Sequence, residues 1–360
     1  MASWPVNAAE VVRRTVAAMT TATNVPPEPA PGANEPPERL SPSRAKDYMQ
    51  CPKLFYFKTV LGIREPGTEA TLRGTIAHAA FERIFDHEPG NRGVEQILPY
   101  VEPALAMLLE PLVPREQVTE GTPQWRLRAA EQRFREDHAP GSRSEQRLLR
   151  EADEVRSILD ELDEEAFLET VRQVVRGWYG MESPHKFTPD ARELHVAAKI
   201  AGVTVHGFID RLDKITGADG IERVYVTDYK TGKRVRPKYE DEAFFQLAVY
   251  ALLLRESAGI DVTQLRLVFT KVGDPSGVVT RTVDQQLLTK TRKQLTAVWN
   301  AIGKSYRTDD WPTRRQPLCG WCYFQEVCPE FNPELEGLLP EELERQLAGE
   351  SGPSAGEQVV

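Results

Sequence analysis

The pattern of apolar residues changes near residue 190, and this change limits the chain to a fold that mixes helices with strands. Before it, apolar residues recur every three or four positions, as on helices. After it, three segments alternate apolar and polar residues, and a helix, a fourth strand and a last helix follow. This order predicts an α/β core. The predicted strands are residues 192–200, 203–211, 223–230 and 264–271, and the predicted helices are residues 71–86, 241–257 and 284–306.

Composition sets the boundaries of the folded part. Residues 26–37 hold six prolines and no large apolar residue, so residues 1–39 are predicted to be a disordered tail. Residues 332–360 are acidic and end in small polar residues, which predicts a second flexible tail. Residues 40–331 are predicted to form one domain. The charged, helical stretch of about residues 87–190 is interpreted as an insertion in that domain.

The distribution of charge is more informative than its total. The chain carries 45 Lys plus Arg against 54 Asp plus Glu, which excludes a uniformly basic coat protein. No apolar run reaches the roughly 20 residues of a membrane helix, so a cytoplasmic protein is expected, with an organelle transit peptide as the alternative. Residues 223–238 nevertheless hold six Lys or Arg against one Asp. This basic stripe is either a solvated loop or a contact for a phosphate backbone.

Two carboxylates and an amine lie where predicted strands end. Asp228 and Lys230 are two residues apart, so both side chains lie on one face of their strand. A simple ion pair between them is one interpretation, and a divalent cation on the carboxylate is the other. Asp210 ends the preceding strand, and pairing of the two strands would bring two like charges together. Such a meeting favours a cation between them.

These residues belong to a series of motifs that resembles, in order and spacing, the RecB-type nuclease domain of the PD-(D/E)XK superfamily. The resemblance covers about residues 40–86 and 190–331. It implies a restriction-endonuclease-like core, a mixed central sheet flanked by helices, and metal-dependent cleavage of DNA. The motifs are Leu40 to Ser43 with Tyr48, Cys51-Pro52 and Phe55; Gly74 to His78; Gly207-x-x-Asp210-Arg211-x-Asp213; Val226 to Lys233; and Gln246-x-x-x-Tyr250.

The resemblance also implies roles for individual residues. His78, Asp210, Asp228 and the backbone carbonyl of Tyr229 would bind Mg²⁺ or Mn²⁺, and an imidazole ligand suits Mn²⁺ better. Lys230 would orient or deprotonate the attacking water, so that Lys230, Asp228 and Asp210 are the implied catalytic residues. Taken alone, His78 is more simply a structural histidine and Tyr250 a core residue. The residues expected to contact substrate or to support the metal site are Gln246, Tyr250, Lys233, Arg234, Arg236 and Glu193.

The four cysteines form one remote position, Cys51, and a compact group of Cys319, Cys322 and Cys328. Four thiols with none to spare favour a metal tetrathiolate over disulfides. Zinc usually takes two tight pairs. One remote cysteine with a cluster of three instead resembles the 4Fe-4S staple of iron–sulfur members of the nuclease family, including CRISPR adaptation nucleases and helicase-nuclease subunits. Such a cluster would join the N- and C-terminal parts of the domain, and zinc remains the alternative.

Together these features predict a Mg²⁺- or Mn²⁺-dependent deoxyribonuclease. The expected activity is that of an exonuclease on single-stranded or end-containing DNA, in repair or recombination. The expected partners are DNA and a helicase, recombination or CRISPR protein, and no membrane. The alternative is a catalytically silent module with the same fold that holds DNA ends or a helicase. A missing motif residue would favour the silent module, and none is missing.

Overall fold

The computed structural model describes residues 35–109, 143–335, 337–338 and 340–348. The chain divides into two compact units. Among the described residues, 66–109, 143–198 and 207–291 form the larger one, called here the sheet unit. The described residues of 35–65, 199–206 and 292–348 form the smaller one, called the cysteine unit because it holds all four cysteines. Among the described helices, none combines the length and the hydropathy of a membrane span.

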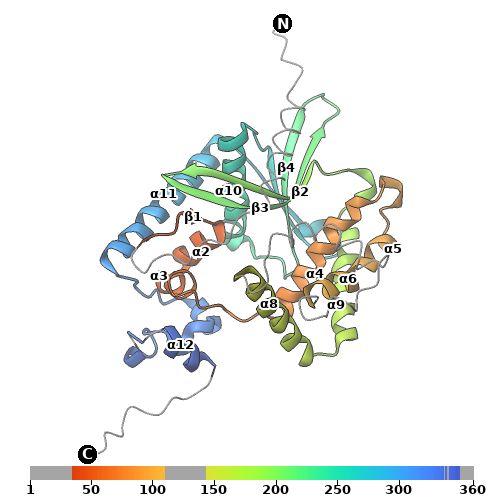
Figure 1. The fold of residues 1–360 in the computed structure, drawn as a ribbon. Helices are drawn as coiled ribbons and strands as arrows, with labels where there is room; N and C mark the ends of the chain where they lie inside the picture. The colour runs from red at the N-terminus through yellow and green to blue at the C-terminus, as the bar shows by residue number, and fades with distance from the viewer. Residues whose placement is uncertain (1–34, 110–142, 336, 339, 349–360) are drawn as a thin grey trace, which may run out of the picture. The chain divides into compact units, whose positions relative to one another are not determined.

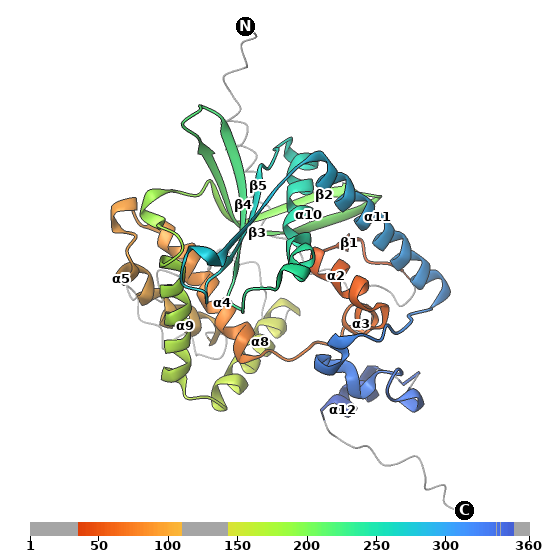
Figure 2. The same cartoon turned by 180° about the vertical axis from the view of Figure 1, so that it is seen from behind.

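The sheet is mixed and contains the four predicted strands together with two that were not predicted, β1 and β6 (Figure 1). β3 pairs antiparallel with β4, β4 parallel with β5, β5 antiparallel with β6, and β2 pairs with β3. Because parallel strands need a crossover, α10 connects β4 to β5 and packs on both (Figure 2). The predicted α/β class, a mixed sheet flanked by helices, is confirmed. The strands are β2 (Ala191–Ile200), β3 (Val203–Thr216), β4 (Glu222–Lys230), β5 (Gln264–Phe269) and β6 (Val278–Thr282).

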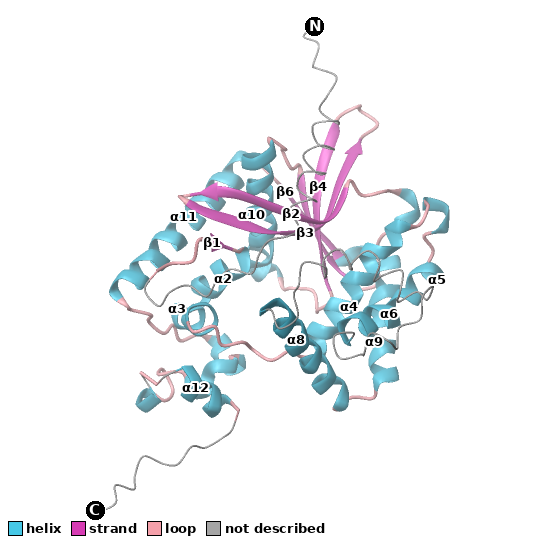
Figure 3. Cartoon of the chain, in the orientation of Figure 1, coloured by secondary structure: helices cyan, strands magenta, loops and turns pink. Residues whose placement is uncertain are grey.

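Helix α4 carries His78 and is fixed on the sheet by a large apolar core. It begins at a capping box formed by Thr68 and Thr71, and it packs on α6 and α9 (Figure 3). Phe81 and Trp178 are buried in this core with Tyr229 of β4. The helices of the sheet unit are α4 (Glu69–Arg83), α5 (Val94–Ile97), α6 (Val101–Leu109), α8 (Arg143–Asp160), α9 (Glu164–Tyr179) and α10 (Glu240–Ala258), with 3-10 turns at 84–86, 89–91, 98–100, 184–186, 237–239 and 275–277.

The cysteine unit is built from both ends of the described chain. Strand β1 (Arg39–Leu40) pairs parallel with Thr204 and Val205 at the tip of the β2–β3 hairpin. An apolar cluster that includes Leu54, Phe57 and Phe324 forms its core. The other elements are α2 (Pro42–Gln50), α3 (Pro52–Phe55), a π-helical turn (Tyr56–Val60), the later part of α11 (Gln285–Thr308), 3-10 turns at Pro317–Trp321, Tyr323–Val327 and Pro333–Leu335, and α12 (Pro340–Leu347).

The structure differs from the sequence-based expectation at both tails. Residues 332–360 were expected to be flexible, yet α12 lies within them and buries Leu343 against the cluster around Phe324. Apolar Leu338, Leu343 and Leu347 supply the contacts that hold this acidic helix. At the other end, β1 begins at Arg39, one residue before the expected boundary. The predictions for residues 1–34, 110–142 and 349–360 lie outside the described residues.

Candidate active site

The pairing of β3 with β4 brings Asp210 and Asp228 together. The register places Arg211 opposite Thr227, so that the next pair along the two strands is Asp210 with Asp228. The predicted strand pairing is therefore confirmed. The backbone N–H of Tyr229 donates to Asp210 Oδ2 at 2.8 Å and fixes this carboxylate beside β4. Burial, together with the negative charge of Asp228, raises the pKa of Asp210 to about 6.

His78 reaches the same place from α4. Its Nε2 lies 3.0 Å from the carbonyl oxygen of Tyr229, and its Nδ1 lies 3.4 Å from Asp210 Oδ2. Either ring nitrogen can carry the proton; with the proton on Nδ1, which faces Asp210, Nε2 keeps a lone pair for a cation beside the Tyr229 carbonyl. Neighbouring ligands of an octahedral ion with bonds of about 2.1 Å lie about 3.0 Å apart. The His78 nitrogen and the Tyr229 oxygen already have this spacing.

Glu193 adds a third side chain. Among the described residues, His78, Glu193 and Asp210 are the group of metal-ligating side chains whose ligand atoms all lie within 4.8 Å of one another. The φ angle of Glu193 is 44°, a left-handed value that is unfavourable for a residue with a Cβ and that interrupts the regular strand. Burial, followed by the charges of Asp210, Glu82 and Asp228, raises the pKa of Glu193 to about 8. Three acids thus act on this carboxyl, and its burial strengthens their effect.

Asp228 is paired with Lys230 but is not satisfied by it. Lys230 Nζ lies 2.7 Å from Asp228 Oδ2, so the ion pair considered from the sequence is present. Oδ2 is nevertheless buried without a hydrogen bond of acceptable geometry. The distance reports electrostatic attraction, whereas the angle leaves the lone pairs of the oxygen unused. Because buried polar atoms normally have partners, Oδ2 is an acceptor that a cation could complete.

The donor set fits a hard divalent ion. It offers carboxylate oxygens, one backbone carbonyl and one imidazole nitrogen, which suit Mg²⁺ and, with the imidazole, Mn²⁺. Burial and neighbouring negative charge destabilise the ionised forms of Asp210 and Glu193 and so raise both pKa values. A bound cation would offset this destabilisation. The residues present could therefore hold such an ion.

A buried ionic cluster lies beside these carboxylates, and the sequence did not reveal it. Arg211, with only 1% of its side chain exposed, donates to both carboxylate oxygens of Glu182 at 2.9 Å and to Asp213 Oδ2 at 2.9 Å. Arg266 Nη2 donates to Glu182 Oε1 at 2.7 Å. Burial alone would raise the pKa of Glu182, yet the two guanidinium groups hold it at about 2. This arrangement is called the Arg211 cluster below.

Tyr229 connects the Arg211 cluster to the candidate metal site. Its hydroxyl accepts a hydrogen bond from Arg211, while its backbone N–H and carbonyl contact Asp210 and His78. The ring is 4% exposed and packs against Phe81 and Trp178. The backbone groups of Tyr229 are thus held from the side-chain end as well as by the strand.

Gln246 and Tyr250 lie on one face of α10, as their spacing predicts. Gln246 Nε2 donates to Tyr250 Oη at 2.7 Å. The Tyr250 ring lies against Gly207, where an added Cβ would stand 2.5 Å from a ring carbon. This close approach explains why the motif that contains Asp210 begins with glycine. Burial raises the pKa of Tyr250, and the charges of Asp228 and Asp210 act in the same direction, so the phenol is both packed in the core and near the carboxylates.

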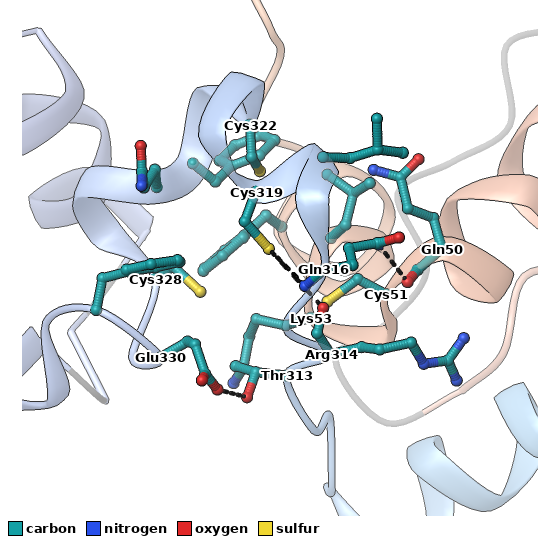
Figure 4. Close-up of a pocket in the computed structure, with 16 residues that line it drawn as sticks. Gln50, Cys51, Lys53, Thr313, Arg314, Gln316, Cys319, Cys322, Cys328 and Glu330 are labelled. Atoms are coloured by element: carbon teal, nitrogen blue, oxygen red, sulfur yellow. Dashed lines mark hydrogen bonds between the residues drawn. The ribbon is translucent and has the colours of Figure 1, made fainter.

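The four cysteines line one pocket of the cysteine unit (Figure 4). All four are half-buried free thiols. Burial raises the pKa of the Cys322 and Cys328 thiols, and the charges of the other cysteines add to this effect. No three of the sulfur atoms lie within 4.8 Å of one another in the described residues, whereas a tetrahedral zinc ion with bonds of about 2.3 Å holds its sulfurs about 3.8 Å apart.

One comparison with known proteins identifies a family. A family model described as the PD-(D/E)XK nuclease superfamily matches residues 39–329. The chain belongs to this superfamily. No curated protein matches the chain. A crystal structure described as a "putative exonuclease" from Eubacterium rectale is similar, with a TM-score of 0.44 and 12% identity over 81% of this chain and 89% of that one. A likeness of this size has no bearing on the activity.

Divalent metals serve as cofactors in the PD-(D/E)XK superfamily, and the group of His78, Glu193 and Asp210 is a possible acidic site for one. The structure brings His78, Asp210, Asp228, Tyr229, Lys230 and Glu193 together. Lys233, Arg234 and Arg236 lie on the exposed loop between β4 and α10. The motifs of Asp210 and Asp228 thus meet on the β3–β4 pair, with His78 on α4 and Gln246 and Tyr250 on α10, whereas the motif of Leu40 to Phe55 lies in the cysteine unit.

Proposed function

We propose that this PD-(D/E)XK protein is a metal-dependent deoxyribonuclease of the RecB type. The proposed substrate is single-stranded or end-containing DNA, cut as by an exonuclease. The observation that carries the proposal is the convergence of His78, Asp210 and Asp228, with the Lys230 amine beside the buried Oδ2 of Asp228. This combination supplies ligands for a cation and a cationic donor for a phosphate at one place.

The chain's own groups have separate proposed roles. His78, Asp210, Asp228 and the carbonyl of Tyr229 would hold the cation, with Glu193 at its side. When bound, Mg²⁺ or Mn²⁺ polarises a phosphoryl oxygen and lowers the pKa of a water molecule. The Lys230 side chain is 37% exposed, so its amine can donate to that water or to the phosphate and offset developing negative charge. We propose that Lys233, Arg234 and Arg236 contact the strand and that Gln246 and Tyr250 support the site.

The decisive test removes one charge without changing shape. Asp228→Asn should reduce Mn²⁺-dependent cleavage of end-labelled, linear single-stranded DNA by about 10³-fold or more. Binding of the same DNA in EDTA should persist. Asp219→Asn is the matched control, because Asp219 lies in an exposed turn and pairs only with nearby groups of that turn. Circular single-stranded DNA, which has no end, should resist the wild-type enzyme.

Two outcomes would reject the enzymatic proposal. Undiminished cleavage by Asp228→Asn would show that this carboxylate is not catalytic. Wild-type protein that binds DNA ends but leaves them intact with Mg²⁺ and with Mn²⁺ would support the silent binding module instead. Rapid cutting of circular DNA would retain the nuclease and reject the exonuclease.

We also propose that Cys51, Cys319, Cys322 and Cys328 hold a 4Fe-4S cluster. The convergence of the four thiols on one pocket supports it, because thiolates are the ligands of such clusters. Apolar Leu54, Phe57 and Phe324 line the same pocket and limit access of water. Protein purified without oxygen should be brown, with iron and sulfide in equal amounts, and Cys328→Ser should lose the colour. A colourless protein with one zinc per chain would reject the cluster.

The proposal extends to the organisation of the chain. Residues 40–331 would form the nuclease domain, with the helical insertion of about residues 87–190, and α12 adds to the apolar core around Phe324. We further propose a cytoplasmic enzyme of repair or recombination that works with a helicase or recombination protein; four free thiols favour a reducing compartment.

A further inference from the structure

We propose that Arg73, Lys233 and Lys271 form a phosphate-binding site beside the candidate metal site. The site would take a phosphodiester of the bound strand other than the one being cut. This inference rests on the proposed function as a DNA nuclease. Lys233 belongs to the basic stripe seen in the sequence, but Arg73 and Lys271 lie about 160 and 40 residues away from it and show no pattern that would join them to it.

Three segments converge to form this site. An added Cβ on Gly74 would stand 3.1 Å from Thr231 Oγ1, so the first half of α4 lies against the residue that follows β4. The backbone N–H of Thr270 donates to the carbonyl of Lys230 at 3.0 Å, so the end of β5 lies beside the end of β4. Each of the three segments carries a cationic residue close to these contacts. The residues are Arg73 on α4, Lys233 after β4 and Lys271 after β5.

A further contact holds the two loops on one surface. Arg234 Nη1 donates to the carbonyl of Ser276 at 2.7 Å and so ties the β4–α10 loop to the turn between β5 and β6. Both Lys233 and Lys271 are exposed. Their amines can therefore reach a ligand that lies on this surface.

The cations face one another with little compensation. Burial lowers the pKa of Lys271, and the positive charges of Arg73 and Lys233 lower it further. One acid, Glu69, acts in the opposite direction, so that three cations less one anion leave two positive charges. Like charges held together repel, and a bound anion relieves that repulsion. The chemistry favours a phosphate over a neutral ligand.

Arg73 is prepared to donate. Its Nη1 binds Glu69 Oε1 at 2.6 Å and its side chain is only 11% exposed. Its Nε is buried and has no hydrogen-bond partner among the described residues. Such an atom normally has an acceptor, and a phosphate oxygen is an acceptor of the right charge.

The position of this site suits a neighbouring phosphate. Arg73 precedes His78 by five residues on α4, a rise of about 7.5 Å along the helix axis. Lys233 follows Lys230 by three residues. A single strand whose scissile phosphate lies at Lys230 can therefore place a phosphate one or two nucleotides away at Arg73, Lys233 and Lys271.

The test measures DNA binding separately from cleavage. A fluorescent single-stranded oligothymidylate is titrated with protein in EDTA at salt concentrations from about 50 to 200 mM. Lys271→Gln and Lys233→Gln should each weaken binding about fivefold near 0.1 M salt and lower the salt slope by about 0.7. Lys186→Gln is the matched control, because Lys186 is an exposed lysine of a 3-10 turn outside the three segments. Its affinity and slope should equal those of the wild type.

The outcomes separate this inference from the nuclease proposal. Wild-type affinity and slope in both Lys271→Gln and Lys233→Gln would overturn the phosphate site, as would a wild type that does not bind the strand. An equal loss in Lys186→Gln would also overturn it, because only net charge would then matter. In the cleavage assay with Mn²⁺, the two variants should raise KM and leave kcat unchanged. Wild type that binds but never cleaves would reject the nuclease while the binding result still supports the site.

Discussion

The Arg211 cluster and the candidate metal site lie next to each other on β3, where Asp210 is followed by Arg211. Their charges are balanced in different ways. In the Arg211 cluster, two guanidinium groups face Glu182 and Asp213, and the pKa of Glu182 is held at about 2. At the candidate metal site, the pKa of Glu193 rises to about 8 and that of Asp210 to about 6.

The difference indicates where a ligand belongs. The fold supplies its own counter-ions for the Arg211 cluster, although burial still raises the pKa of Asp213, whose Oδ1 has no hydrogen-bond partner. It supplies too few for the carboxylates of the metal site. A buried charged residue is therefore not by itself a sign of a functional site. The sign is a buried charge for which the chain provides no opposite charge.

The largest expected effect is on stability, when the Arg211 guanidinium is removed from the Arg211 cluster. Arg211→Met should lower the free energy of unfolding by about 3–5 kcal/mol, because it leaves Glu182 buried without its main partner. Urea denaturation measures the change. Arg223→Met is the matched control, since Arg223 pairs with Asp219 in an exposed turn and should unfold like the wild type. Wild-type stability in Arg211→Met would show that the cluster is not a buried counter-ion system.

The second largest effect is expected when a cation binds at the candidate metal site. Mn²⁺ at about 100 times its dissociation constant should stabilise the fold by about 2.7 kcal/mol, and Asp228→Asn should lose most of this gain. The gain should depend on pH. Glu193 and Asp210 hold protons more tightly in the folded state than their usual pKa values of 4.5 and 3.8 allow. The stability they contribute is complete at low pH and is lost as the pH rises through about 6 and about 8.

The metal should therefore raise the melting temperature more at pH 8 than at pH 5.5, because it replaces protons that are bound at the lower value. Thermal unfolding with Mn²⁺ and with EDTA at both pH values measures this. A metal-induced shift that is equal at the two pH values, or larger at the lower one, would contradict the assignment of these carboxyls as ligands.

The smallest expected effect separates stability from metal binding at one residue. Glu193→Gln should stabilise the metal-free protein at pH 8 by about 1–2 kcal/mol, because it removes a buried charge without a partner. It should also weaken the stabilisation by Mn²⁺. Glu222→Gln, at an exposed position of β4, is the control and should change neither quantity. If Glu193→Gln destabilises the metal-free protein, Glu193 has a structural partner and is not an uncompensated charge.

Much of the fold could be predicted because it depends on local periodicity. The strands around Asp210 and Asp228 and the helices α10 and α11 all show their period in the sequence. β6 does not, since it has five residues and buries only Val279. Its place is set by pairing with β5. Helix α12 was missed because its acidic composition concealed the few leucines that hold it.

The site shows the same limit. Motif spacing predicted which residues would meet, because strand pairing and one helix place them. It could not predict the partner of Arg211, since Glu182 lies in a turn 29 residues upstream and no periodic pattern connects the two. Nor could it predict the left-handed backbone at Glu193, which is imposed by tertiary packing and not by the residue itself.

The pocket of the four cysteines also sets an order of events during synthesis. Cys51 leaves the ribosome long before Cys319, Cys322 and Cys328, which line the same pocket. Leu54 and Phe57 must wait equally long for Phe324 to cover them. A chain cut off before Cys319 therefore presents bare apolar side chains and an unfilled set of thiols, which a chaperone or a protease can recognise.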